Sequence, residues 1–366
     1  MQQAKTRATR SPIKRPTAES NILISLTCFG LTVAVTRIYL EWAGYPQIGN
    51  DVLHIAHALW GGLLLFVAVL VTLVLANRWA LTLSAVLSGV GVGLFIDEVG
   101  KFITQKNDYF FPPAAPIIYA AFLLMVLLFL LVRRSRRPSP RASLYRALLG
   151  LCELLDHDLD TQERDRILVE LENGRTAREP HIALLAEQLT TYLQHDATPL
   201  TAYRPGFWAR AYNRLRMVGE KVGRKMHRRI IIVLTALSGI SALVLVTLLL
   251  WSWLSPEMAG EIMPALLVAP AETTDPSPVW LITRLILQTL VGLLYLASWL
   301  QFVRKKEDAA VNTAIFASLF AFTVVNLLNF YLNQFGALTA FFSNLTVYFI
   351  LVAYRSWYLA PRDGSE

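Results

Sequence analysis

The stretch HIAHALWGGLLLFVAVLVTLVLANRWALTLSAVLSGVGVGLFIDEVGK, residues 54–101, decides the fold. It holds two blocks without charge, Ala58 to Asn77 and Trp79 to Ile96. A helix needs about 20 apolar residues to cross the hydrocarbon core of a bilayer, and each block is close to that length. The turn between them is no longer than Asn77-Arg78, so the two helices should be antiparallel neighbours. The histidines before the first block should therefore lie near the acidic pair after the second.

Further apolar blocks lie on both sides of this stretch. They are Ser20 to Val35 (extending to Tyr39), Tyr109 to Val132, Ile230 to Pro256, Val279 to Val303 and Ala309 to Tyr354. The last block is too long for one helix, and Asn333-Gln334-Phe335-Gly336 is the expected turn. The sequence therefore predicts an all-α polytopic bundle of eight transmembrane helices.

Composition supports a membrane protein. The chain has 366 residues, of which 55% are hydrophobic and 16% charged, whereas a soluble chain has about 25% charged residues. Only two cysteines are present, so neither a disulfide framework nor a thiolate metal site is expected. A soluble enzyme and a disordered chain are excluded. The net charge of +8 is explained by the positions of Lys and Arg relative to the spans, and binding to nucleic acid is not expected.

Lys and Arg concentrate in segments that should all lie on the cytoplasmic side. This distribution predicts a bacterial plasma (inner) membrane protein with both termini in the cytoplasm. The expected parts are a basic cytoplasmic tail (1–19), a first four-helix half (20–132), a helical cytoplasmic insert (133–229), a second four-helix half (230–358) and a cytoplasmic tail (359–366).

The insert should be helical. We expect helices at Ser143 to His157, from Thr161 to a stop at Asn173-Gly174, and at Glu179 to Gln194. Residues 205–229 are basic with interleaved aromatic and aliphatic residues, which favours a helix on the anionic lipids of the inner leaflet over a solvated helix. A cytoplasmic protein partner could bind through residues 141–200.

Ionisable residues gather at the expected outer ends of the first spans. Asp51, His54 and His57 should share one helix face, and the antiparallel pairing brings them near Asp97 and Glu98. The candidate site consists of His54, His57 and Asp97 as metal ligands, Glu98 and Lys101 as catalytic groups, and Lys101 or Arg37 as the group that holds an anion. Two imidazoles and a carboxylate suit zinc or another divalent transition metal.

Three functions are compatible with this cluster. The leading hypothesis is a metal-assisted enzyme acting on a lipid or an envelope substrate. The second is a transporter or channel that uses the cluster as an ion or proton coupling site, and the third is a scaffold whose insert binds a partner. The cluster could also only fasten helix ends, with Lys101 or Arg37 neutralising Asp97 or Glu98. The glycines from Gly89 to Gly93 are interpreted as helix packing and not as a nucleotide-binding loop.

The second half also contains polar residues at membrane depth. They are Arg284, Gln288, Asn326, Asn329, Asn333 and Asn344. Asn326, Asn329 and Asn333 have the spacing of one helix face, so hydrogen bonds between helices are expected. The alternative is a cavity for a polar or anionic head group with Arg284 as its fixed positive charge. Arg37, Arg284 and Asn329 are therefore the candidate substrate- or ion-binding residues.

One pattern carries a resemblance. The stretch GLFIDEVGKFIT (93–104), which continues to NDYFFP (107–112), with His54-x-x-His57 upstream, resembles a pattern of uncharacterised bacterial multi-pass membrane proteins. The resemblance covers about the first four spans and implies no particular activity. Membrane hydrolases of the alkaline-ceramidase type use three histidines, an aspartate and a serine. This chain departs from them, because only two histidines fall in the expected spans.

Overall fold

The computed structural model describes residues 11–43, 56–105, 111–134, 138–195, 200–202, 207–254 and 278–359. Within these ranges the regular elements are helices, and one isolated bridge joins Asp160 to Thr201. Eight of the described helices are long and apolar enough to cross a membrane. The all-α fold and the eight spans expected from the sequence are confirmed.

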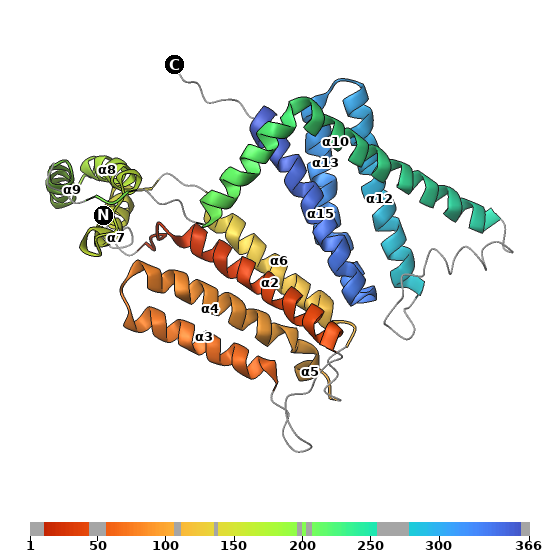
Figure 1. The fold of residues 1–366 in the computed structure, drawn as a ribbon, viewed down its shortest axis with the longest axis horizontal. Coiled ribbons are helices and arrows are strands. Elements are labelled where there is room, and N and C mark those ends of the chain that lie inside the picture. The colour runs from red at the N-terminus through yellow and green to blue at the C-terminus, as the bar shows by residue number, and fades with distance from the viewer. Residues whose placement is uncertain are drawn as a thin grey trace, which may run out of the picture. The chain divides into compact units, whose positions relative to one another are not determined.

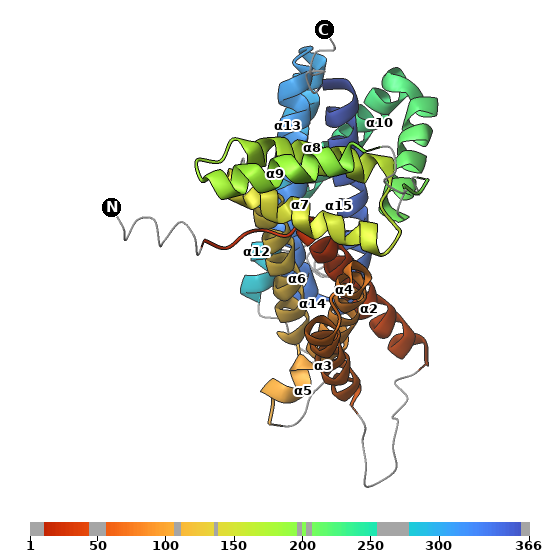
Figure 2. The ribbon, with the colours of Figure 1, turned by 90° about the vertical axis from the view of Figure 1, so that its left-hand side faces the viewer.

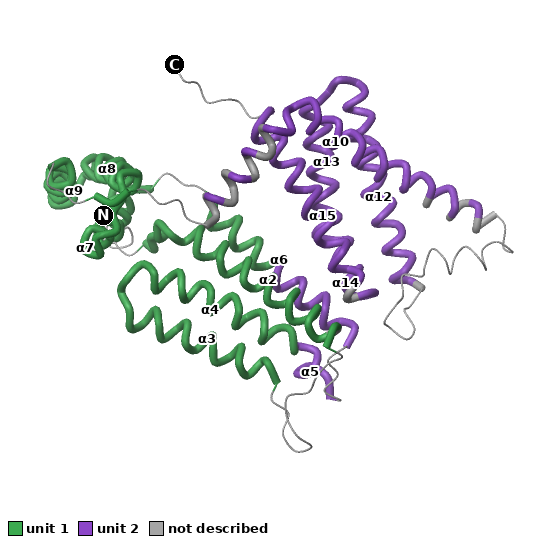
Figure 3. The backbone as a smooth tube through the Cα atoms, viewed as in Figure 1, with its two compact units in different colours: residues 1–98, 124–206 green, residues 99–123, 207–366 purple. Residues whose placement is uncertain are grey.

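The chain forms two compact units, which Figure 3 colours separately. The first unit comprises residues 1–98 and 124–206, and the second comprises residues 99–123 and 207–366. Helix α6 (Ala114–Arg133) contributes to both. The short helix α5 (Val99–Ile103) belongs to the second.

The membrane part of the first unit contains α2 (Ala18–Ala43), α3 (His57–Val74) and α4 (Arg78–Asp97). Helix α4 packs against both of the others and lies between them (Figure 1).

Glycines make these contacts close on two faces of α4. A Cβ at Gly91 would lie 2.8 Å from the carbonyl oxygen of Gly61 in α3, and one at Gly93 would lie 2.7 Å from the Cβ of Thr32 in α2. Small residues at such positions allow helix backbones to approach closely. The interpretation of the Gly89–Gly93 pattern as helix packing is confirmed.

The insert folds as three helices, α7 (Pro140–Leu155), α8 (Thr161–Arg175) and α9 (Pro180–Leu193), close to the expected positions. Their shared core consists of Leu144, Ala147, Leu159, Ile167, Leu171, Ala186 and Leu193. Asp160 and Glu163 form a capping box that starts α8. The expected stop at Asn173-Gly174 is one residue early. Gly174 does not have positive φ, and a Cβ there would lie 3.2 Å from the Cβ of Ala186, so this glycine serves close packing.

The second unit contains α10 (Phe207–Leu254), α12 (Pro278–Val303), α13 (Glu307–Phe320), the π-helical turn η1 (Ala321–Val325), α14 (Asn326–Leu332), α15 (Gln334–Tyr354) and the π-helical turn η2 (Arg355–Leu359). Helix α10 bends at Gly223, where φ is 69° and ψ is 157°. The expected turn after α14 is confirmed, because Asn333 has extended backbone angles and its side chain accepts a hydrogen bond from the Gly336 N–H at 2.6 Å.

Candidate functional site

Four ionisable side chains meet at one end of the α2–α4 layer. Arg37 lies on α2, His57 is the first residue of α3, Asp97 is the last residue of α4, and Glu98 follows it. Asp97 and Glu98 have no exposed surface, Arg37 is 5% exposed, and the His57 side chain is 25% exposed. We call these four residues the charged cluster. Ionisable groups at membrane depth are costly to bury, so such a cluster is a candidate functional site.

Asp97 forms an ion pair with α2. The Nε of Arg37 donates to its Oδ1 at 2.7 Å, and both side chains are buried. The Nε2 of His57 lies 3.3 Å from the other carboxylate oxygen. Asp97 therefore joins α4 to α2 through Arg37 and lies within ion-pair distance of His57 on α3.

Glu98 supports the beginning of α3. Its Oε2 accepts a hydrogen bond from the Ala58 N–H at 2.8 Å, and its Oε1 lies 3.6 Å from the Nδ1 of His57. The N-cap residue Ala56 has no side-chain acceptor of its own. A carboxylate from α4 thus takes the capping role and lies at the positive end of the α3 dipole.

The order of the three helices explains why two adjacent carboxylates have different partners. Consecutive residues on a helix point about 100° apart. Gly89, Gly93 and Asp97 share the face of α4 toward α2, whereas Gly91 and Glu98 point toward α3. Each glycine face thus ends in one carboxylate.

The charge of the cluster depends on His57. The guanidinium contributes one positive charge and the two carboxylates contribute two negative charges. The four side chains therefore sum to −1 when His57 is neutral and to zero when it is protonated. One proton on His57 thus makes the charged cluster electrically neutral. Neutrality favours burial of the cluster, because unbalanced charge is costly away from water.

The helix ends bring together some of the residues that the sequence predicts for the site. The proximity of His57 to Asp97 and Glu98 is confirmed, and Arg37 forms an ion pair with Asp97. Lys101 lies on α5 in the second unit, and its expected catalytic role stays a prediction. Sequence reasoning missed the capping role of Glu98, because no local signal announces an acceptor 40 residues from its donor.

The expected metal ligands are only partly described. Asp51 and His54 lie outside the described residues. Helix α3 begins at His57 after the extended residue Ala56, so α3 does not supply the shared helix face expected for the histidine pair. In the described part of the chain, no group of three or more His, Cys, Asp and Glu side chains could hold a metal ion.

A second polar region lies in the second unit. The Oδ1 of Asn326, a fully buried residue, accepts from the Nδ2 of Asn329 at 3.3 Å and from that of Asn344 on α15 at 3.2 Å. Hydrogen bonding between helices is thus observed, as expected. Asn333 does not share this face, because it breaks the helix and caps α15. The sequence analysis missed Tyr119 of α6, whose hydroxyl donates to the carbonyl oxygen of Phe322 within η1.

Arg284 differs from Arg37 in having no protein partner among the described residues. It lies near the start of α12 and is only partly exposed, and its Nε is buried without a hydrogen bond. Neither an ion pair nor a hydrogen bond joins its side chain to another residue in the described part of the chain.

The fold and the composition together define a class, a multi-pass helical membrane protein. No protein-family model, curated protein or solved structure matches the chain. The resemblance to uncharacterised bacterial multi-pass membrane proteins therefore stays a prediction.

Proposed function

We propose that the protein is a proton-coupled membrane transporter or channel in which the charged cluster binds and releases one proton. The observation that carries this proposal is the position of His57, whose two ring nitrogens lie 3.3 Å from Asp97 and 3.6 Å from Glu98. Both carboxylates are fully buried. Buried ionisable groups within membrane helices commonly form proton and ion pathways.

Proton binding to His57 should affect how closely the start of α3 associates with the end of α4. A protonated imidazole carries a positive charge that attracts both carboxylates, at 3.3 Å and 3.6 Å, whereas a neutral imidazole carries no charge. Loss of the proton removes the imidazolium charge that attracts the two carboxylates at the end of α4 to the start of α3. Protonation would thus favour close association of these two helix ends, and deprotonation would weaken it.

The metal-assisted enzyme gains no support from the described residues. Asp97 already holds the Arg37 guanidinium, and Glu98 already accepts the Ala58 N–H. A metal ion would have to compete with both contacts and recruit His54. We therefore propose that the charged cluster binds a proton and not a metal ion.

The cellular setting is part of the proposal. We propose a bacterial inner membrane, cytoplasmic termini and contact of residues 205–229 with anionic lipids. The bend at Gly223 supports this contact, since it allows the basic residues before it to take a direction different from that of the span. A lipid phosphate is the proposed partner of Arg284, because a guanidinium that pairs with none of the described residues favours a phosphate anion.

Infrared difference spectroscopy on protein in lipid nanodiscs tests the proton site. We expect a pH step to produce an imidazole protonation signal that disappears in His57→Gln, and carboxylate bands that change in Asp97→Asn. His181→Gln, an exposed histidine on α9, is the matched control and should keep the signal of the cluster. Identical spectra for the wild type and His57→Gln would refute the proton site.

Metal analysis of the same samples separates the two functions. Stoichiometric zinc in the wild type that is lost in His57→Gln would replace the proton proposal with the enzyme. Proton flux into proteoliposomes that requires Asp97 would extend the result from binding to transport.

A further inference from the structure

Helix α7 of the insert has an exposed apolar face. Tyr145 is 52% exposed, Leu148 is 40% and Leu149 is 41%, and Cys152 is exposed as well. We call these four residues the α7 face. Helix α7 is not one of the eight candidate spans, so these exposed side chains are not explained by a helix that crosses the membrane.

The α7 face is not a gap in the packing of the insert. The opposite side of the helix carries the fully or nearly buried residues Leu144 and Ala147, which join the core shared with α8 and α9. Arg146 pairs with Glu170 of α8 at 2.8 Å on the flank. The helix therefore has one face that the insert covers and one that it does not.

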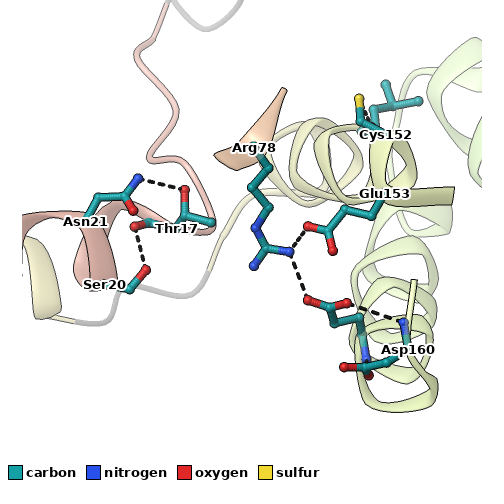
Figure 4. A network of polar contacts seen from close by, with 9 residues as sticks. Thr17, Ser20, Asn21, Arg78, Cys152, Glu153 and Asp160 are labelled. Atoms are coloured by element: carbon teal, nitrogen blue, oxygen red, sulfur yellow. Dashed lines mark hydrogen bonds and ion pairs between the residues drawn. The ribbon is translucent and has the colours of Figure 1, made fainter. Parts of the chain in front are cut away.

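The C-terminal end of α7 contacts the turn between two membrane helices. The Nδ2 of Asn77 donates to Asp156 at 3.2 Å. Arg78 pairs with Glu153 of α7 and, at 2.9 Å, with Glu163 of α8 (Figure 4). Asn77 is the N-cap of α4 and Arg78 is its first residue, directly after the turn from α3, so these contacts hold the end of α7 beside the start of α4.

The N-terminal end of α7 contacts the segment that leads into α2. The Nη1 of Arg141 lies 3.4 Å from the carbonyl oxygen and the hydroxyl of Ser11. Three residues further along, Lys14 donates to the carbonyl oxygen of Val132, near the C-terminal end of α6, at 2.7 Å. Within one unit, the C-terminal end of α7 is thus linked to the start of α4, and its N-terminal end is linked to the segment that precedes α2.

The contacts of Arg141 with Ser11 and of Asp156 with Asn77 come from the side of the helix that carries the α7 face. Arg141, Tyr145, Cys152 and Asp156 follow at intervals of four or seven residues, which places them along one side of a helix. Figure 2 shows α7 running crosswise to α2, α3 and α4. The α7 face is therefore directed toward the level at which the spans end, and the protein itself leaves it uncovered.

We infer that α7 is an interfacial helix whose exposed face lies against the phospholipid bilayer, in the head-group layer. An amphipathic helix parallel to the surface buries its apolar face there, with polar residues toward water. The contacts with Asn77 and Ser11 hold α7 at that level. The inference rests on the membrane-spanning fold and not on the proton proposal.

Cys152 provides the test, because it lies in the α7 face and Cys28 is the only other cysteine. The full-length protein with Cys28→Ser is labelled at Cys152 with an environment-sensitive fluorophore and placed in phosphatidylglycerol-containing nanodiscs. Lipids with a nitroxide near the head group then act as quenchers from the bilayer, and iodide acts as a quencher from water. The matched control carries Cys28→Ser, Cys152→Ser and Gln188→Cys, which moves the label to an exposed position on α9. Helix α9 lies on the side of the insert away from α3 and α4 (Figure 1).

We expect the label at Cys152 to emit at shorter wavelength and to be quenched several-fold more by the lipid nitroxide than the label at residue 188. Equal quenching by lipid at both positions, with equal access to iodide, would overturn the inference. Protection of Cys152 from both quenchers would also overturn it, because a second copy of the chain or a protein partner would then cover the α7 face.

Discussion

Replacing Arg37 with Met should destabilise the first unit strongly, because the change leaves the carboxylate of Asp97 buried without its guanidinium. The two groups form a 2.7 Å ion pair in which Arg37 is 5% exposed and Asp97 is not exposed at all. Removing one partner of a buried pair costs about 3–5 kcal/mol, most of which is the penalty for the remaining unpaired charge.

The expected loss of stability depends on how deeply the ion pair is buried and not on the distance between its two charged groups. Lys14 and Glu19 form a pair of similar length, 2.6 Å, but their side chains are 38% and 44% exposed. An exposed pair contributes at most about 1 kcal/mol, so Lys14→Met is the matched control. In the double variant Arg37→Met with Asp97→Leu the unpaired charge is gone, and most of the lost stability should return.

The measurement is the free energy of unfolding in mixed micelles, obtained by titration with SDS and followed by circular dichroism. A loss of less than about 1 kcal/mol in Arg37→Met would show that water or another group replaces the guanidinium. In that case the pair is not buried in the folded protein, and the charge argument for the cluster fails with it. A double variant no more stable than Arg37→Met would show instead that the loss comes from packing.

Three further predictions concern helix packing, the insert and the bend in α10. Gly91→Val should lower the free energy of unfolding by more than about 2 kcal/mol, because a Cβ there would lie 2.8 Å from the backbone of α3. Gly62→Val is the control, since a Cβ there meets nothing within 4 Å, and it should change the free energy of unfolding in the same SDS titration only slightly. Arg78→Met should speed hydrogen exchange in α7 without unfolding the spans, whereas Arg175→Met, which removes an exposed pair with Glu172, should leave the exchange unchanged. Gly223→Ala should cost about 1–3 kcal/mol of strain at φ 69° and change the distance between spin labels on either side of the bend; an unchanged distance would contradict a fixed bend.

The spans could be predicted from the sequence because hydrophobic length is a strong local signal. The same argument gave the neighbourhood of His57 and Asp97, since a turn as short as Asn77-Arg78 leaves only antiparallel packing for the two blocks. Arg37 was one of two candidates for neutralising the carboxylates. The contact of Arg37 with Asp97 depends on the parallel packing of α2 on α4. That packing could not be predicted, because no short turn connects these two helices.

The start of α3 and the end of α14 could not be predicted from local spacing alone. Histidines three residues apart suggest one helix turn, but Ala56 is extended and α3 starts at His57. The start is supported by Glu98, on another helix. Likewise, the spacing of Asn333 from Asn326 predicts that both lie on one helix face. In the structure, Asn333 has an extended backbone, ends α14 and caps α15 with its side chain. Local spacing cannot decide between these outcomes, because the competing hydrogen bonds differ little in strength.

The glycines and the charges of α4 belong to one arrangement. A hydrogen bond or short ion pair requires heavy atoms within about 3.5 Å, and the contacts of Asp97 with Arg37 and of Glu98 with the Ala58 N–H are 2.7 Å and 2.8 Å long. The small residues that set the separation of α3 from α4 lie on the Glu98 face, whereas those that set the separation from α2 lie on the Asp97 face. A wider helix separation would break these contacts while the carboxylates remained buried. Close packing at the glycines is therefore a condition for the stability of the buried charges, and a motion that separates α3 from α4 would act first on the contacts of Glu98 with Ala58 and His57.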